Sequence, residues 1–324
     1  MKEITIRDIE GVELGHASDY ENGTGCTVIL CEAGAVAGVD VRGGGPATRE
    51  TDLLRPENMV ERIHAVVLSG GSAFGLDASS GVMEYLERRG AGFDTGVAKV
   101  PLVCAASLFD LGVGSSSVRP DKEMGIVACG QAASPNADDK LEGNVGAGVG
   151  CSVGKLAGME HATKSGIGMA GLDIDGLQVA VVIAVNAAGN VINKDGSVLA
   201  GVRDDDGKPM QQEQFIFAPK KAFAQLASGN PVTNTTIGCV VTNAEITKAQ
   251  ARKIASIAHD GLARAINPVH TSNDGDTLFV MGTGSVQVQN VVDTVGVLSA
   301  ELIEQAIRNA VKKAEDAFGL PAIN

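Results

Sequence analysis

The sequence predicts an α/β protein in which helices pack on the outside of stacked β-sheets. Runs typical of β-strands occur near both ends of the chain. Long helices are expected at about 73–89, 247–266 and 299–318, and they do not alternate regularly with strands. No internal repeat or long linker divides the 324 residues, so we expect a single domain spanning 1–324.

Composition excludes several classes of function. Hydrophobic residues make up 44% of the chain and charged residues 20%, which is typical of a soluble globular protein. The net charge of −13 argues against a nucleic-acid partner, because phosphate binding needs a basic surface. No apolar run reaches the ~18 residues of a membrane helix, and the N-terminus lacks a secretory apolar segment. We therefore expect a cytoplasmic protein without a membrane partner.

The six cysteines and five histidines show no metal-binding spacing. There is no Cys-x-x-Cys pair and no His-Glu-x-x-His motif. The cysteines stand mostly among apolar or small residues, which favours buried free thiols. We accordingly predict no metal and no cofactor.

The first 41 residues are expected to be β-structure. Strands are predicted at 26–31 and 35–41, joined by a Glu-Ala-Gly turn at 32–34. The following loop, 42–52, combines three glycines with two arginines and two acidic residues. Such a loop either lines a functional site or is simply solvated, and its residues leave both interpretations open.

A glycine turn at 70–72 is expected to lead a buried strand, 65–69, into the helix at 73–89. Free backbone N–H groups at such a helix start can bind an anion or an oxyanion. Ser72 is not a nucleophile elbow, because the Gly-x-Ser-x-Gly motif would need glycine where Phe74 stands.

Residues 95–135 are rich in glycine and serine and are expected to be irregular. A second glycine-rich run, 143–154, fails both nucleotide-binding motifs. Cys151 stands where the dinucleotide motif needs glycine, and Leu156 stands where the Walker A motif needs Ser or Thr. We expect a close-packed or strained backbone that only glycine permits, with Lys155 positioned at its end.

Two predicted strands have polar residues at their ends. The apolar strand 178–186 closes with Asn186, whose amide could donate to an oxyanion or cap the turn. The strand 235–242 begins with Thr235 after a polar, turn-rich segment. If the Asn234–Thr235 bond were cut, the free α-amine, with an ordinary pKa of about 7.7–8.0, could activate the Thr235 hydroxyl. Alternatively, threonine simply favours an extended chain here.

Two carboxylates, Asp274 and Asp276, bracket a glycine immediately before an apolar strand. They could orient and tune a nearby amine or hydroxyl. The alternative is an ordinary Asp-Gly turn.

Several of these stretches together resemble one family. They are 39–52, 68–76, 143–148, 234–238 and 274–277. They are similar, in the same order, to motifs of the DmpA-like peptidases, which comprise L-aminopeptidase/D-esterases, β-aminopeptidases and nylon-oligomer endo-hydrolases. The resemblance extends from about residue 5 to 318.

The resemblance implies a four-layer α/β/β/α sandwich like that of N-terminal-nucleophile hydrolases. It also implies self-cleavage between Asn234 and Thr235, which would leave chains 1–234 and 235–324 associated. Members of the family form compact homo-oligomers, often tetramers, so a homo-oligomer is expected here too.

The resemblance also implies a set of site residues. The nucleophile falls on Thr235, and the Asp-x-Asp pair of the most similar hydrolases falls on Asp274 and Asp276. The remaining matches are Asn186 at a strand end and a lysine, which is Lys155 in the better alignment and Lys164 in the other. Together they imply a self-processing amidohydrolase that cleaves small peptides or amides through an acyl-enzyme.

Some features leave alternatives open. Aminopeptidases of the family carry acidic and tyrosine residues where Ser107 and Phe109 stand here, so recognition of a free substrate amine stays open. Acyl transfer to an amine, as in the ornithine acetyltransferases, is a second hypothesis. A non-catalytic metabolite-binding relative is the third.

Overall fold

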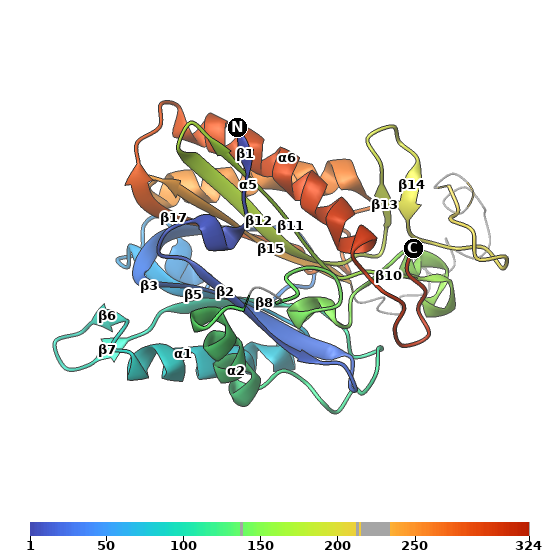
Figure 1. The fold of residues 1–324 in the computed structure, drawn as a ribbon, viewed down its shortest axis with the longest axis horizontal. Helices are drawn as coiled ribbons and strands as arrows, with labels where there is room; N and C mark the ends of the chain where they lie inside the picture. Colours follow the sequence, from blue (N-terminus) through green and yellow to red (C-terminus); the bar gives the residue numbers. More distant parts are fainter. Residues whose placement is uncertain (137–138, 212–213, 215–233, 324) are drawn as a thin grey trace.

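The computed structural model describes residues 1–136, 139–211, 214 and 234–323. The main strands form two layers stacked face to face, with a pair of helices on each outer side (Figure 1). On one side lie α5 (Lys248–Ala265) and α6 (Val291–Lys312), and on the other α1 (Ala78–Arg88) and α2 (Lys122–Ala133). This arrangement is the predicted α/β/β/α sandwich.

The main strands of the described chain form one continuous hydrogen-bonded path, β1-β11-β12-β15-β17-β3-β5-β8-β4, with β2 also beside β3. Their bounds are β1 (Lys2–Glu3), β2 (Glu13–Asp19), β3 (Thr24–Val41), β4 (Ala47–Arg49), β5 (Arg62–Ser69), β8 (Val103–Ser107), β11 (Ile167–Ile174), β12 (Leu177–Asn186), β15 (Thr235–Ala244) and β17 (Thr277–Val286). Shorter strands form small separate sheets: β6 (Phe93–Asp94) with β7 (Lys99–Val100), β9 (Ser152–Val153) with β10 (Thr163–Lys164), and β13 (Asn190–Ile192) with β14 (Val198–Ala200) and β16 (Ile266–Asn267).

Strand β3 continues from one layer of strands into the other. Its first part, up to Leu30, pairs with β2 and β5. Ala35 and Val36 pair with β5 again, and residues from Val36 onward also pair with β17. The predicted turn at 32–34 is therefore wrong. Gly34, at φ +82°, absorbs a shift in register with β5, and the chain continues as one strand.

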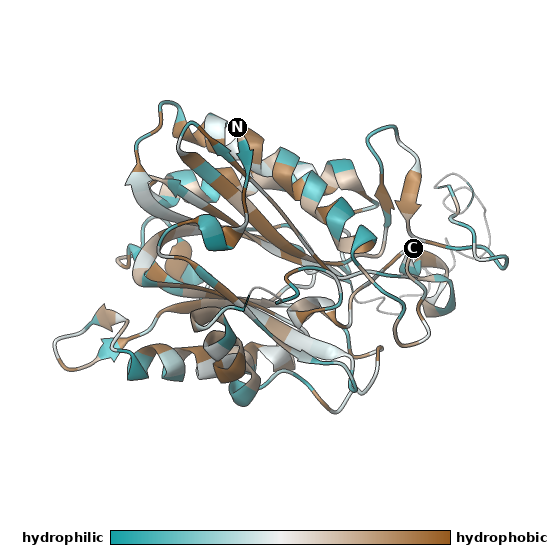
Figure 2. Cartoon of the chain, viewed as in Figure 1, coloured by the Kyte–Doolittle hydropathy of each residue, from teal (hydrophilic) through white to brown (hydrophobic). Residues whose placement is uncertain are grey.

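Three hydrophobic cores lie between the four layers. The core between the sheets includes Ile29, Val66, Val182, Ile237 and Phe279. The core under α5 and α6 includes Val181, Val240, Ile254, Leu262 and Ile303. The core under α1 and α2 includes Val28, Val67, Val82, Leu86 and Ala128. Figure 2 shows apolar residues along the strands and hydrophilic residues on the outer helix faces. Strand β15 is buried on both faces, which explains its lack of charged residues.

The helices only partly follow the sequence prediction. Helix α5 matches it, and the side chains of Thr247 and Gln250 cap its start reciprocally. Helix α6 begins and ends earlier than the predicted 299–318. Residues 95–135 are not irregular throughout, because they contain β8 and α2. Gly125 of α2 lets the backbone approach α1, since a Cβ there would lie 2.1 Å from the carbonyl oxygen of Ala78.

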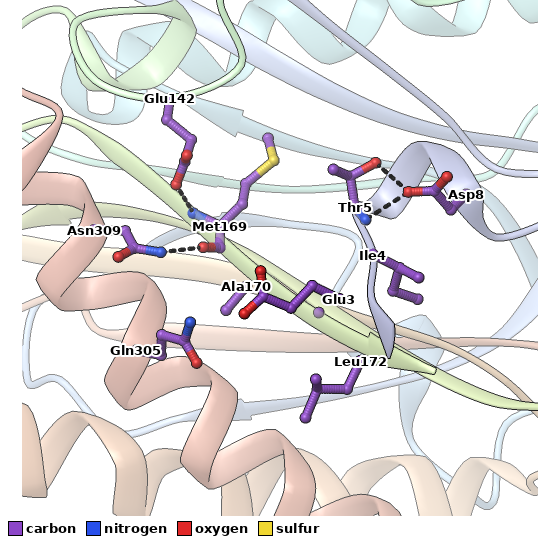
Figure 3. A pocket seen from close by; sticks show the side chains of 11 residues that line it. Glu3, Ile4, Thr5, Asp8, Glu142, Met169, Ala170, Leu172, Gln305 and Asn309 are labelled. Atoms are coloured by element: carbon purple, nitrogen blue, oxygen red, sulfur yellow. Dashed lines mark hydrogen bonds between the residues drawn. The ribbon is translucent and has the colours of Figure 1, made fainter. Parts of the chain in front are cut away.

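Side chains close the outer edge of β11 (Figure 3). The Met169 N–H donates to Glu142 Oε1 at 2.8 Å, and the Met169 carbonyl accepts from Asn309 Nδ2 at 2.8 Å. Farther along, the Ile4 N–H donates to the Gly171 carbonyl. A pocket of about 280 Å³ lies at this edge. No helix in the described part of the chain is both long enough and apolar enough to cross a membrane.

Candidate active site

The predicted site residues converge because three neighbouring strands begin or end at the same place. Thr235 is the first residue of β15, and it lies opposite Asn186, the last residue of β12, in antiparallel register. Strand β17 runs parallel to β15 on its other side and begins at Thr277, directly after Asp276. The topology thus gathers a hydroxyl, an amide and a carboxylate at one end of the sheet.

The Asn234–Thr235 peptide is held between its own hydroxyl and a backbone donor. The Thr235 hydroxyl donates to the carbonyl oxygen of Asn234. The Gly275 N–H donates to that same oxygen at 3.0 Å. Thr235 is 5% exposed and Asn234 1% exposed, so both groups interact away from bulk water.

The two carboxylates are fixed mainly by N–H donors. Asp276 Oδ1 accepts from the Thr236 N–H at 2.7 Å, and its Oδ2 accepts from His270 Nδ1 at 2.8 Å. Asp274 Oδ2 accepts from the Thr271 N–H at 2.6 Å. Burial raises the pKa of the Asp274 carboxyl, and the nearby charge of Asp276 raises it further.

Lys155 reaches Asn186 from the end of the glycine-rich run. Its Nζ donates to Asn186 Oδ1 at 2.6 Å and to the Asn186 carbonyl at 3.2 Å. The Ser152 N–H also donates to that Oδ1, while Asn186 Nδ2 donates to the Phe109 carbonyl at 2.8 Å. Burial lowers the pKa of Lys155 to about 7, and the charge of Asp274 acts in the opposite direction.

Lys164 makes a different set of contacts. Its ammonium is fully buried and donates to the carbonyls of Gly148, Cys151 and Ser165. Burial lowers the pKa of Lys164 to about 8. Lys164 therefore holds the backbone of the glycine-rich run, whereas Lys155 contacts Asn186 directly.

The loop after β3 packs its backbone against the two aspartates. The Arg42 N–H donates to the Asp276 carbonyl at 3.0 Å, and the Gly45 N–H donates to the Asp274 carbonyl at 2.8 Å. A Cβ on Gly43 would lie 2.2 Å from that Asp274 carbonyl oxygen. The glycines thus allow the two backbone segments to approach closely. The two interpretations left open by the sequence, a loop that lines a site and a solvated loop, did not include this role.

Sequence reasoning missed Asp110. This buried carboxylate accepts from the Gly71 N–H at 2.7 Å and from the Thr24 hydroxyl at 2.7 Å. Its pKa is raised, with burial the largest cause. The N–H groups of the glycine turn at 70–72 could bind an anion or an oxyanion, and the carboxylate of Asp110 accepts from one of them. Asp110 follows Phe109, whose carbonyl holds the amide of Asn186.

Two further features concern possible metal ligands and Ser107 among the described residues. No three or more His, Cys, Asp or Glu side chains gather there where they could hold a metal ion. Ser107 is buried in β8, and its hydroxyl hydrogen bonds to no described group.

Comparison with known proteins shows to which family this chain belongs. The chain matches the model of peptidase family S58 over residues 4–322. An uncharacterized aminopeptidase of Mycobacterium leprae is 38% identical over 98% of this chain and 92% of its own. A 6-aminohexanoate-oligomer endohydrolase of Paenarthrobacter ureafaciens is 32% identical over 89% of this chain and 77% of its own. The L-aminopeptidase D-Ala-esterase/amidase of Ochrobactrum anthropi, a variant of the Ntn-hydrolase fold, superposes with a TM-score of 0.67 at 18% identity, covering 98% of this chain and 89% of that one. The chain therefore belongs to peptidase family S58 and is a hydrolase of peptide or amide bonds.

Proposed function

We propose that this hydrolase cuts its own chain between Asn234 and Thr235 and then uses the Thr235 hydroxyl as its nucleophile. The observation that carries this proposal is the contact of the Thr235 hydroxyl with the Asn234 carbonyl, to which Gly275 donates a hydrogen bond from the opposite chain segment. A nucleophile beside a carbonyl whose oxygen already has a backbone donor is arranged for acyl transfer.

Self-cleavage then proceeds as an N-to-O acyl shift. Thr235 Oγ1 attacks the Asn234 carbonyl carbon, and the Gly275 N–H stabilises the oxyanion. The C–N bond breaks as the hydroxyl proton passes to the amide nitrogen, which becomes the free amine of Thr235. Water hydrolyses the resulting ester, leaving a carboxylate on Asn234 and restoring the hydroxyl.

The same hydroxyl then attacks a substrate. The new α-amine, with an ordinary pKa of about 7.7–8.0, takes the hydroxyl proton and passes it to the leaving amine. Asn186 donates its second Nδ2 hydrogen to the oxyanion, a contribution typically of about 2.7–4 kcal/mol. Asp274 and Asp276 orient the α-amine and the hydroxyl of Thr235, and Lys155 orients Asn186 through its hydrogen bond to Oδ1. Its contact with Asn186 supports Lys155, not Lys164, as the site lysine.

Small peptides and amides are the substrates we propose. The relatives named above are an aminopeptidase and a hydrolase of 6-aminohexanoate oligomers, which share an amide bond as the group cleaved. Water completes each turnover by hydrolysing the acyl-enzyme.

The test is the intact mass and N-terminal sequence of the purified chain under denaturing conditions. We expect fragments 1–234 and 235–324, the second beginning at Thr235. The Thr235→Ala variant should stay uncut and inactive. Thr242→Ala, at the other end of the same strand, should still be cut. A Thr235→Ala chain that is still cut at this bond would disprove the proposal.

A further inference from the structure

We propose that His270 is a positioning residue that fixes the Asp276 carboxylate against the start of β15 and thereby sets the rate of reaction at Thr235. This role rests on the proposed function of Thr235. The sequence alone makes His270 only a weak candidate, because it belongs to no metal-binding motif such as His-Glu-x-x-His.

His270 contacts Asp276 twice. Its Nδ1 donates to Asp276 Oδ2 at 2.8 Å, and its backbone N–H donates to the same oxygen at 3.1 Å. The other oxygen, Oδ1, accepts from the Thr236 N–H at 2.7 Å. With His270 holding one oxygen and β15 the other, the buried carboxylate is restrained from rotating.

His270 is itself held from behind. Its ring meets the ring of His259 edge to face, with centroids 4.8 Å apart and planes at 71°. His259 is buried on α5, and its Nε2 donates to the Asp40 carbonyl at 3.0 Å. A chain of contacts therefore runs from α5 through two imidazoles to the carboxylate beside the nucleophile.

The backbone of His270 limits which residues can replace it. Its φ is +57°, in the left-handed region that His, Asn and Asp occupy more readily than other non-glycine residues. Asn keeps this backbone and offers a side-chain N–H toward Asp276. Asp has the same shape but places a second carboxylate there, which repels the first.

Losing the contact should slow catalysis without greatly changing affinity. If Asp276 rotates, the Thr236 N–H loses its acceptor and the neighbouring Thr235 is free to shift. A misplacement of about 1 Å in a reacting group can reduce the rate by about 100-fold. The chain supplies its own probe, because self-cleavage needs no added substrate.

The experiment compares self-cleavage rates of His270→Asn, His270→Asp and His270→Ala with wild type, by denaturing gels sampled after synthesis. We expect His270→Asp and His270→Ala to be slowed about 10- to 100-fold, and His270→Asn to stay within about 10-fold of wild type. On an amino-acid p-nitroanilide that the wild type hydrolyses, kcat should fall similarly while KM stays within about twofold. His64→Ala, which removes a largely buried imidazole on β5, is the matched control and should cleave normally.

Two results would overturn the role of His270. One is a His270→Ala chain that cleaves within twofold of wild type. The other is equal cleavage rates for His270→Asn and His270→Asp. These two variants can be compared with each other even if the alanine variant does not fold. Thr235→Ala is run in parallel. If it is uncut while the His270 variants cleave normally, only this inference fails; if it is cut, the proposed function fails.

Discussion

Gly275 combines two tasks at a single residue. Its N–H donates to the Asn234 carbonyl, and its missing side chain leaves room for the Thr235 hydroxyl. A Cβ at this position would lie 2.7 Å from Thr235 Oγ1 and 3.1 Å from the Gly45 carbonyl oxygen. A side chain between the two aspartates would collide with Thr235, which explains why this residue is glycine.

We expect Gly275→Ala to slow the proposed self-cleavage at least about 10-fold, because the methyl group displaces the Thr235 hydroxyl from the Asn234 carbonyl that it contacts. The measurement is the cut fraction against time after synthesis. Gly130→Ala is the control, because a Cβ there meets no atom within 4 Å on the exposed surface of α2. Unchanged cleavage in Gly275→Ala would contradict the close contact.

Lys155 makes stability depend on pH. Its pKa is about 7 in the folded chain and 10.5 when unperturbed, so above pH 7 the unfolded state binds more protons. The free energy of unfolding should therefore rise with pH from about 7. Burial raises the pKa of all six cysteine thiols. Above about pH 9, where thiols of the unfolded chain ionise, the free energy of unfolding should therefore fall again.

The measurement is urea unfolding between about pH 7 and 9, made on the uncut Thr235→Ala chain so that a single molecule unfolds. Lys155→Met in that background should flatten the rise, leaving only the smaller part that comes from Lys164. An unchanged slope would mean that Lys155 keeps its proton when folded.

The sequence predicted only those site residues that stand at the ends of predicted strands or match motifs of the resembling family. Asn186, Asp274 and Asp276 stand at predicted strand ends. The structure places Asn186 opposite Thr235 and the two aspartates next to the neighbouring Asn234 and Thr236. Asp110 could not be found in this way. Its partners, Thr24 and Gly71, come from distant segments, and no local spacing marks such a contact.

At the scale of elements, the closed edge of β11 protects a strand that would otherwise present bare backbone groups (Figure 3). We expect the double variant Glu142→Ala, Asn309→Ala to self-associate, because the Met169 N–H and carbonyl lose their partners. Light scattering at increasing protein concentration is the measurement. Gln305→Ala removes a polar side chain from the same pocket and should scatter like wild type.

The elements that sequence reasoning missed share one cause. In β3, the sequence around Gly34 is typical of a turn. The glycine does have a positive φ, but pairing with β5 and β17 keeps the chain extended. In α2, Gly125 and Gly130 interrupt the helical pattern, and contact with α1 stabilises the helix. Tertiary contacts decided both elements, whereas α5 has an apolar stripe and a cap that are visible locally.

At the scale of the whole molecule, the proposed cut would leave two interleaved chains. In the strand order β12-β15-β17-β3, the inner two strands would belong to fragment 235–324 and the outer two to fragment 1–234. We expect both fragments to elute together in native gel filtration and to separate only in denaturant. Light scattering on the same peak tests the homo-tetramer, which stays a prediction.

Because the fragments would be interleaved, we expect the chain to fold efficiently only before the proposed cut. Before the cut, the chain folds as one molecule, at a rate that does not depend on its concentration. After the cut, the two inserted strands would have to find their places from a separate molecule, so refolding becomes a second-order process that competes with aggregation. We expect the uncut Thr235→Ala chain to recover its melting transition on a second heating, and the cut protein to lose it. Once cut as proposed, the protein would stay native because it unfolds slowly, since it could not refold efficiently.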